Sequence, residues 1–391
     1  MTTKQIPGAG EGTRSAPSET PGPTGTKVLM KGNEALAEAA IRAGCVHFFG
    51  YPITPQTEVP EYLVKRLPEE GGVFVQAESE VAAVNMIMGA AGVGVKCLTS
   101  SSSPGISLMA EGLSYIASCE LPCVLINIMR AGPGLGGVLA AQGDYMQATK
   151  GHGHGDYQLI VLAPSSVQES VDLMLLSFDL AERYLNPVML CADGMIGQMM
   201  EPVSFPTEGR GAPMKENEWA LTGADGRKPR LVNSLVLAPE ALDAHNRKLK
   251  AKYERVAEEE MRWEVYGAEQ GYDLLITAFG TMARIVKTAI DEVAGEGLRA
   301  ALFRPIMINP FPYTQCREAM DGIAGDGLVL DIEMNMGQML YDIKLAGEGS
   351  RRIEFIGSAG GMVPSPDEVA AKIRELLGSR GERNEKTEVD R

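Results

Sequence analysis

One carboxylate stands at an unexpected place, at the start of an almost wholly apolar helical pattern. Glu80 follows the strand pattern GVFVQA (72–77) and opens the segment EVAAVNMIMGAAG, which is apolar on nearly every face. A carboxylate there would be partly removed from water, which suits it to proton transfer. A glutamate in a first helical turn is also common because it complements the helix dipole. The residue types alone leave both interpretations open.

Several glycine-rich segments resemble phosphate-binding motifs but lack parts of them. The segment 132–137 follows a strand pattern and formally matches GxGxxG, yet several strands precede it and Pro133 stands between the glycines. The segment GAAGVGVK (89–96) lacks the GK[ST] ending of a P-loop. Gly325-Asp-Gly resembles the start of a GDG diphosphate-and-metal motif, but the next asparagine, Asn335, comes too soon. We therefore expect this chain to hold no diphosphate or metal site of its own.

Cysteine and histidine spacing favours neither a cluster nor a metal site. The six cysteines, Cys45, Cys97, Cys119, Cys123, Cys191 and Cys316, form neither a CxxC pair nor a ferredoxin-type run. His152 and His154 lie in a glycine-rich segment without a third strong ligand nearby. Scattered free cysteines are typical of a cytoplasmic protein, which is the location we expect.

Charge and hydropathy exclude some classes of partner. The formal net charge is −15, and an acidic surface repels phosphate backbones, so we expect no nucleic-acid partner. No apolar run reaches the roughly 20 residues of a membrane span. The first 26 residues contain no apolar core of a secretory signal and read as a disordered tail rich in Pro, Gly, Ser and Thr.

Helical and strand patterns alternate along two stretches of the chain. Uniformly apolar strands that alternate with helices indicate α/β domains with parallel sheets covered by helices. We predict a first domain over 27–200, a linker and a long charged helix (239–266) over 201–266, a smaller second domain over 267–378, and a charged tail over 379–391.

The sequence also carries segments that are specific to a known family. KVLMKGNEALAEAAIRAG, GYPITPQTEVPEYL, VFVQAESEVAAVNMIMGAA, TSSSSPGISLMAEG and VLINIMRAGPGLGG resemble the alpha subunit of 2-oxoacid:ferredoxin oxidoreductases. Later landmarks are RPIMINPFP, DIEMNMGQML and GGMVPSP, and the similarity runs from about Lys27 to Leu377. Within that family the chain is most similar to the 3-methyl-2-oxobutanoate branch.

The resemblance implies a fold and a set of partners. The first domain should be a thiamine-diphosphate-binding-type pyrimidine domain, and the second should resemble the transketolase C-terminal domain. Thiamine diphosphate would be shared with a beta subunit that binds the diphosphate and Mg²⁺. Gamma and ferredoxin-like delta subunits would carry iron–sulfur clusters toward ferredoxin, and coenzyme A (CoA) would be a co-substrate. The implied reaction is the oxidative decarboxylation of a 2-oxoacid to an acyl-CoA.

The resemblance also assigns roles to individual residues. Glu80 matches the glutamate that hydrogen-bonds N1′ of the aminopyrimidine, a task that suits its apolar helix. Thr54, in Tyr-Pro-Ile-Thr-Pro, matches a threonine near the substrate carboxylate, although it could be only a turn residue. Arg130 ends the strand pattern LINIM and matches an arginine that pairs with the substrate. An arginine at the carboxyl end of a buried parallel strand can hold a carboxylate bidentately, although a salt bridge is the alternative.

Contacts to the cofactor are expected from two loops. Besides Glu80, we expect Tyr51, Pro52, Ser102 and Ser103 to line the cofactor site. The serines belong to a polar run that could instead serve only to cap the next helix.

Two other functions remain compatible with these patterns. A pyrimidine domain followed by a transketolase-like domain also describes the E1-beta subunit of lipoyl-dependent 2-oxoacid dehydrogenases. A CoA- or dinucleotide-binding regulatory protein is a non-enzymatic alternative. Within the ferredoxin-dependent class, 2-oxoglutarate is the second candidate substrate, but we find no clear second cation for its distal carboxylate.

Overall fold

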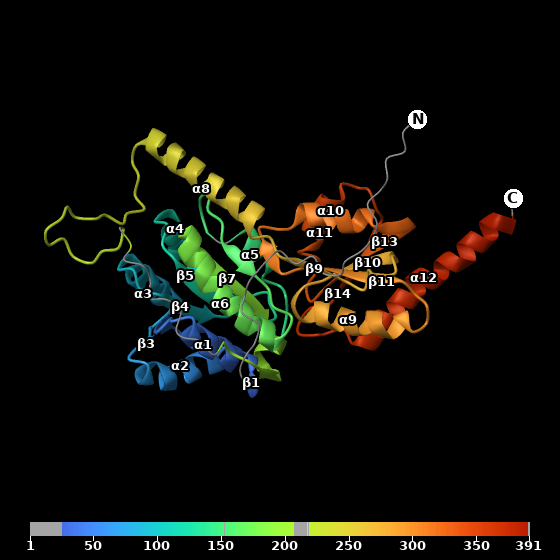
Figure 1. The fold of residues 1–391 in the computed structure, drawn as a ribbon, viewed down its shortest axis with the longest axis horizontal. Coiled ribbons are helices and arrows are strands. Elements are labelled where there is room, and N and C mark those ends of the chain that lie inside the picture. Colours follow the sequence, from blue (N-terminus) through green and yellow to red (C-terminus); the bar gives the residue numbers. More distant parts are fainter. Residues whose placement is uncertain (1–25, 152, 207–216, 218, 390–391) are drawn as a thin grey trace.

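The computed structural model describes residues 26–151, 153–206, 217 and 219–389. Residues 1–25 of the predicted N-terminal tail, His152, most of 207–218 and the last two residues of the predicted charged tail lie outside these residues. Within them, the chain forms two large sheets and one small one, flanked by helices (Figure 1). The α/β class with mainly parallel sheets is therefore confirmed.

The first large sheet is parallel except at one edge. In spatial order it contains seven described strands: β12 (Met307–Asn309), β6 (Ile160–Leu162), β7 (Pro187–Asp193), β5 (Cys123–Met129), β4 (Cys97–Ser101), β2 (His47–Gly50) and β3 (Val73–Gln76). Only β12 runs antiparallel, to β6. Its helices are α1 (Gly32–Arg42), α2 (Glu58–Glu69), α3 (Glu80–Gly92), α4 (Pro104–Ser118), α5 (Tyr145–Thr149), α6 (Val167–Tyr184) and α7 (Gly194–Gln198).

The second large sheet contains five described strands. In order its described strands are β14 (Ile353–Gly357), β13 (Ile323–Glu333), β10 (Tyr272–Thr277), β11 (Ala300–Pro305) and β9 (Trp263–Tyr266), with β9 antiparallel to β11. Helices α9 (Gly280–Ala294), α10 (Tyr313–Asp321), α11 (Leu340–Gly347) and α12 (Pro366–Val389) belong to it. Long helix α8 (Pro239–Glu259) precedes it, and β1 (Val28–Lys31) pairs with β8 (Met200–Val203) as a separate ribbon.

Strand β5 explains why the first sheet is buried on both faces. Val124, Ile126 and Ile128 pack into a cluster with helices α1 and α6, whereas Leu125 and Met129 face the cluster that contains α3 and α4. Successive side chains of a strand point to opposite faces, so a continuously apolar strand fills both layers. Burying each such side chain contributes about 1.5–3 kcal/mol.

Strands β9 and β12 differ from the patterns read along the chain. The helix predicted over 239–266 ends at Glu259, and the segment Trp263–Tyr266 instead forms edge strand β9. The run ALFRPIMI, which reads as one strand, divides at Ile306: β11 lies in the second sheet and β12 in the first. Both differences arise because strand pairing depends on a distant partner.

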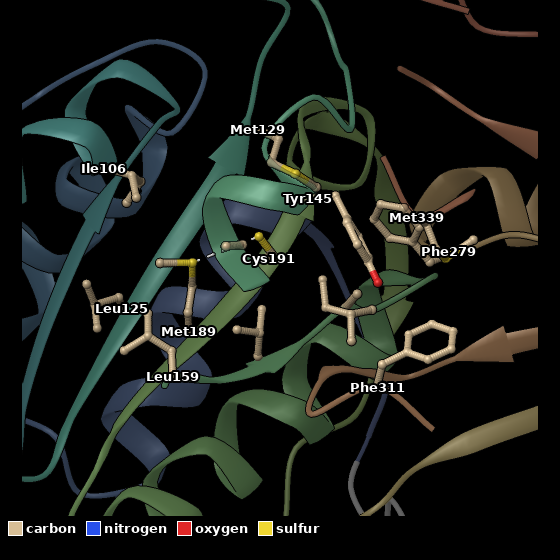
Figure 2. Close-up of a cluster of buried hydrophobic side chains, with 14 of the residues drawn as sticks. Ile106, Leu125, Met129, Tyr145, Leu159, Met189, Cys191, Phe279, Phe311 and Met339 are labelled. Carbon is tan, nitrogen blue, oxygen red and sulfur yellow. Dashed lines mark hydrogen bonds between the residues drawn. The ribbon is translucent and has the colours of Figure 1, made fainter. Parts of the chain in front are cut away.

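One apolar cluster joins the two large sheets. We call each large sheet with its helices a unit. Figure 2 shows Tyr145 of the first unit beside Phe279 and Met339 of the second, and the rings of Tyr145 and Phe279 have centroids 5.5 Å apart. Buried polar contacts reinforce this junction. Asp193 accepts hydrogen bonds from the Thr281 backbone (3.0 Å) and hydroxyl (2.6 Å). The two units therefore meet through an apolar core with directed hydrogen bonds.

A buried carboxyl pair in β13 predicts a pH-dependent stability. Asp331 and Glu333 are both fully buried, and burial followed by the charge of Glu333 raises the pKa of Asp331 well above its ordinary value. The folded state then binds the proton more tightly than the unfolded state. The stabilising contribution is present below the ordinary aspartate pKa of about 3.9 and is lost as pH rises through the raised value.

Asp331→Asn should remove the loss of stability at higher pH, while keeping the acceptor for the Thr277 hydroxyl (2.6 Å). Between the ordinary aspartate pKa and the raised one, we expect the stability of the variant relative to wild type to increase by up to about 1.4 kcal/mol per pH unit. Thermal unfolding at a series of pH values measures it, with the exposed Asp321→Asn as control. Parallel pH profiles for wild type and Asp331→Asn would contradict the expectation.

Candidate functional site

The carboxyl ends of four neighbouring parallel strands bring the predicted residues to one edge of the first sheet. Strands β3, β2, β4 and β5 lie side by side and parallel, so the segments that follow them leave from the same edge. Tyr51–Thr54 follow β2, Glu80 follows β3, Ser102 and Ser103 follow β4, and Arg130 follows β5. The edge at the carboxyl ends of parallel strands is where α/β proteins bind ligands.

Glu80 is buried at the first position of α3. Its side chain is 4% exposed, and Ser79 caps the helix by accepting a hydrogen bond from the Ala82 backbone. No described residue donates a hydrogen bond to the Glu80 carboxylate. A Cβ atom at Gly105 would lie 2.4 Å from Glu80 Oε1 and 2.0 Å from Ser101 Oγ. Only glycine therefore lets the first turn of α4 approach this carboxylate.

Three buried hydroxyl groups, in β4 and directly after it, have no hydrogen-bond partner among the described residues. Thr99, Ser101 and Ser102 are fully buried, and their hydroxyl oxygens have no hydrogen-bond partner in the described part of the chain. An unsatisfied buried hydroxyl is costly, and several at one place indicate a position where a ligand supplies the missing partners. Ser102 was among the residues predicted to line the site, whereas Thr99 was not.

Arg130 lies beneath the glycine-rich segment that follows β5. It is 7% exposed, and its guanidinium donates to the carbonyl oxygens of Thr54 (Nη1, 2.9 Å) and Leu135 (Nη2, 3.1 Å). Its Nε has no partner among the described residues. Thr54 thus meets Arg130 through its backbone carbonyl, while the residue itself is exposed. The Arg130 guanidinium keeps donors for an additional acceptor such as a carboxylate.

Tyr51 and Pro52 are exposed and connect to the site only indirectly. The Tyr51 carbonyl accepts a hydrogen bond from Gln56 Nε2 (3.2 Å), and Gln56 Oε1 accepts one from the Ser100 hydroxyl (2.6 Å). Gln56 is fully buried and was not predicted. Its only sequence signal is an amide in an otherwise Pro- and Thr-rich turn.

Ser103 is the centre of a buried hydrogen-bond group that sequence analysis missed. Its hydroxyl donates to Asp144 Oδ2 (2.6 Å) and accepts from the Arg130 backbone N–H (3.0 Å). Asn127 Nδ2 also donates to Asp144 Oδ2 (3.0 Å), and Asn127 Oδ1 accepts from the Ser103 N–H (3.2 Å). Burial raises the pKa of Asp144, against the lowering effects of these hydrogen bonds and of the Arg130 charge. An asparagine within the apolar strand pattern CVLINIM was the available signal.

A cleft of about 640 Å³ opens beside this group, between the two units. Ser103, Asp144 and the segment 132–134 line it from the first unit, and Asn335 and Gly360 from the second. Its described lining residues include no lysine, arginine or histidine. Across the described part of the chain, no group of three or more His, Cys, Asp or Glu side chains could hold a metal ion. Nor is any described helix long and apolar enough to span a bilayer.

Comparisons with known proteins place this geometry in a family. Residues 38–264 match the model described as pyruvate flavodoxin/ferredoxin oxidoreductase, thiamine diP-binding, and residues 273–369 match pyruvate:ferredoxin oxidoreductase core domain II. The chain is 43% identical over 350 residues to the ketoisovalerate oxidoreductase subunit VorB of Methanothermobacter thermautotrophicus, covering 90% of this chain and 98% of the relative. It is 36% identical over 372 residues to the 2-oxoglutarate synthase subunit KorA of Methanothermobacter marburgensis, covering 88% and 98%.

Solved structures agree with these relationships. The 2-oxoglutarate:ferredoxin oxidoreductase from Magnetococcus marinus, solved with 2-oxoglutarate, coenzyme A and succinyl-CoA bound, aligns with a TM-score of 0.79 at 26% identity. The alignment covers 90% of this chain and 66% of that one, so this chain spans just under two thirds of its length. A split-gene transketolase aligns with a TM-score of 0.53 at 12% identity, which shows the fold alone. These matches confirm the expected combination of a pyrimidine-type and a transketolase C-terminal-like fold.

Proposed function

Because the chain belongs to the family of 2-oxoacid:ferredoxin oxidoreductases, we propose that it is the alpha subunit of such an enzyme and acts only within a multisubunit complex. The overall reaction joins a 2-oxoacid and CoA. It yields an acyl-CoA, CO₂ and a proton, and two electrons leave singly to ferredoxin. Thiamine diphosphate, when bound, supplies the nucleophilic carbon and accepts the electrons left by decarboxylation. The task of this chain is to hold the aminopyrimidine half of that cofactor.

The buried Glu80 carboxylate is the observation that carries this proposal. It receives no hydrogen bond from the described chain, and it lies against Gly105. The unpaired hydroxyl of Ser101, the last residue of β4, is nearby, and the unpaired hydroxyl of Ser102 follows it in the chain. A heterocycle that offers an N–H to the carboxylate and polar atoms to the hydroxyls fits this set of partners. Glu80 then holds a proton at the ring nitrogen, and the apolar helix around it excludes competing water.

Arg130 and Thr54 are proposed to orient the 2-oxoacid. The Arg130 guanidinium is buried and retains an unpaired Nε, so it can donate to a substrate carboxylate without losing its bonds to the two carbonyl groups. Such charge-assisted bonds contribute about 1.5–3 kcal/mol in a buried site. Thr54 lies directly beside the guanidinium through its carbonyl, with its exposed side chain available to a ligand. Tyr51 and Pro52 are proposed to contact the cofactor from the same loop.

A branched-chain 2-oxoacid, 3-methyl-2-oxobutanoate, is the proposed substrate, with 2-oxoglutarate as the second candidate. The relative at 43% identity is named for ketoisovalerate, whereas those named for 2-oxoglutarate share 36% or less. The cleft beside Ser103 has no cation among its described lining residues, and it contains the carboxylate of Asp144. A second substrate carboxylate would therefore be disfavoured there.

The remaining components are proposed to come from other chains. A beta subunit would hold the diphosphate and Mg²⁺, and gamma and ferredoxin-like delta subunits would carry iron–sulfur clusters and pass electrons to ferredoxin. The named relatives are themselves subunits, which supports an assembly of this kind. We propose a cytoplasmic location because such electron carriers and CoA act there.

The proposal is tested by purifying the complex anaerobically through a tag on this chain. CoA-dependent viologen reduction is then compared for 3-methyl-2-oxobutanoate, 2-oxoglutarate and pyruvate. We expect kcat/KM to be highest for 3-methyl-2-oxobutanoate. A preference for 2-oxoglutarate would replace the substrate but keep the class. Co-purification with lipoyl proteins and no viologen reduction would instead indicate an E1-beta-like subunit and overturn the class.

Gly105→Ala should impair activity through steric displacement of Glu80. The added Cβ would meet Glu80 Oε1 at 2.4 Å and Ser101 Oγ at 2.0 Å, so one or both must move. A displacement of about 1 Å in a catalytic group can cost roughly 10²-fold in rate. Viologen reduction by the complex measures this. Gly89→Ala in α3 is the matched control, because its Cβ would meet nothing within 4 Å. Equal activities of the two variants would contradict the packing argument.

A further inference from the structure

Asp144 is a buried carboxylate whose hydrogen bonds into the site have no role in the proposed function. It stands directly before α5, is 8% exposed and lies on the wall of the cleft between the two units. A buried carboxylate must be matched by donors, and here both close donors belong to the site edge: the Ser103 hydroxyl and the Asn127 amide. Asp144 is therefore built into the site and is not a solvated surface group.

Ser103 adopts a backbone conformation that its own residue type disfavours. Its φ of 28° and ψ of −83° place an L residue in a sparsely populated region. Such a conformation persists only where the surroundings determine it from several sides. Asn127 Oδ1 binds the Ser103 N–H, Asp144 Oδ2 binds its hydroxyl proton, and the Arg130 N–H donates to its hydroxyl oxygen. Because the Ser103 hydroxyl donates its proton to Asp144, its oxygen can accept the hydrogen bond from the Arg130 backbone N–H.

Ser103 holds two neighbouring parts of the site in position. On one side it holds the backbone of Arg130, whose guanidinium is proposed to bind the substrate carboxylate. On the other side it is the residue from which α4 starts, and it thereby sets the position of Gly105 against the Glu80 carboxylate. A shift of Ser103 would be transmitted to both proposed groups.

We propose that Asp144 is a positioning residue of the 2-oxoacid site, which acts through Ser103 to hold Arg130 and the first turn of α4 in their working positions. This inference rests on the proposed function. It adds a residue that neither the family resemblance nor the spacing of the sequence identified, and it assigns Asp144 no direct part in bond making or breaking.

A double-mutant cycle in the purified complex tests this route. Asp144→Asn keeps the shape of the side chain but weakens acceptance of the Ser103 hydroxyl, and Ser103→Ala removes that hydroxyl. We expect each single variant to raise the KM for 3-methyl-2-oxobutanoate by about tenfold, the loss of one charge-assisted hydrogen bond, with a smaller change in kcat. The double variant should resemble either single one, because both substitutions break the same connection. Effects that multiply in the double variant would overturn the proposal.

Ligand-induced stabilisation provides a readout that does not depend on turnover. At a concentration of 3-methyl-2-oxobutanoate that raises the thermal midpoint of the wild-type complex, the midpoint of Asp144→Asn should rise less, because stabilisation follows affinity. The exposed Asp156→Asn removes a carboxylate from the segment that follows α5 and should behave as wild type. If Asp144→Asn fails to assemble, Ser103→Ala decides alone, since a normal KM in that variant would overturn the proposal.

The outcomes separate this inference from the proposed function. A wild-type complex that is active, with Asp144→Asn and Ser103→Ala unchanged in KM and ligand stabilisation, rejects only the role of Asp144. A wild-type complex without activity toward any 2-oxoacid rejects the proposed function and this role with it.

Discussion

Replacing Glu80 by Gln is expected to lower CoA-dependent viologen reduction of the purified complex by about 10²–10⁴-fold, the usual contribution of a positioned acid–base group. The amide has nearly the same shape as the carboxylate, so packing against Gly105 is retained. It cannot hold the proton that the carboxylate holds at the ring nitrogen. The loss should therefore be in kcat, while the KM for the 2-oxoacid changes little.

Glu78→Gln is the matched control for this variant. Glu78 lies two residues earlier and is exposed, so the same chemical change is made outside the site. The control should retain wild-type activity and the same subunit composition on gel filtration. An active Glu80→Gln complex would show that this carboxylate does not carry the proton, and the proposal for the pyrimidine site would have to be withdrawn.

Arg130→Met should raise the KM for the 2-oxoacid by about 10–100-fold, because a charge-assisted pair contributes roughly 1.5–3 kcal/mol. The variant also loses the hydrogen bonds to the carbonyl groups of Thr54 and Leu135, which connect the segments after β2 and β5. Arg130→Lys should restore only part of the affinity, since a single ammonium cannot bind both carbonyl groups and a carboxylate in the fork geometry of a guanidinium. Steady-state kinetics of the complex at varied 2-oxoacid concentration measures both effects.

Arg352→Met serves as the control because Arg352 is exposed and pairs with Glu354 at the surface of the second unit. It should leave the KM unchanged. A KM for Arg130→Met within about twofold of wild type, far below the change expected from losing a buried charge pair, would exclude Arg130 from substrate binding.

The apolar strand patterns of the sequence predict the parallel core of the first sheet and the polar residues at the ends of its strands. Apolar strands that alternate with helices predict parallel order, and parallel order places the residues after β2, β3, β4 and β5 at one edge. Glu80 and Arg130 could be identified in this way because each is a charged residue directly beside an apolar strand. The family-specific segments then supplied their proposed roles, which no periodicity contains.

The way in which these residues are held depends on contacts between elements that are far apart in the sequence. Asp144 and Asn127 bind Ser103 from 41 and 24 positions away, and no local pattern connects them. The structure also showed that the Thr54 carbonyl, and not its side chain, meets Arg130. Hydropathy periodicity reports which face of an element is buried, whereas hydrogen bonds depend on directions and distances that are set when separate elements pack.

The same reason explains where the element boundaries differed from the patterns. The run ALFRPIMI reads as one strand pattern, yet β11 pairs within the second sheet and β12 with β6 of the first. The segment Trp263–Tyr266 continues a charged helical pattern but leaves it to pair with β11. A strand is stabilised by hydrogen bonds to a partner that is distant in sequence, so its limits are fixed when the two sheets assemble and cannot be read from the strand alone.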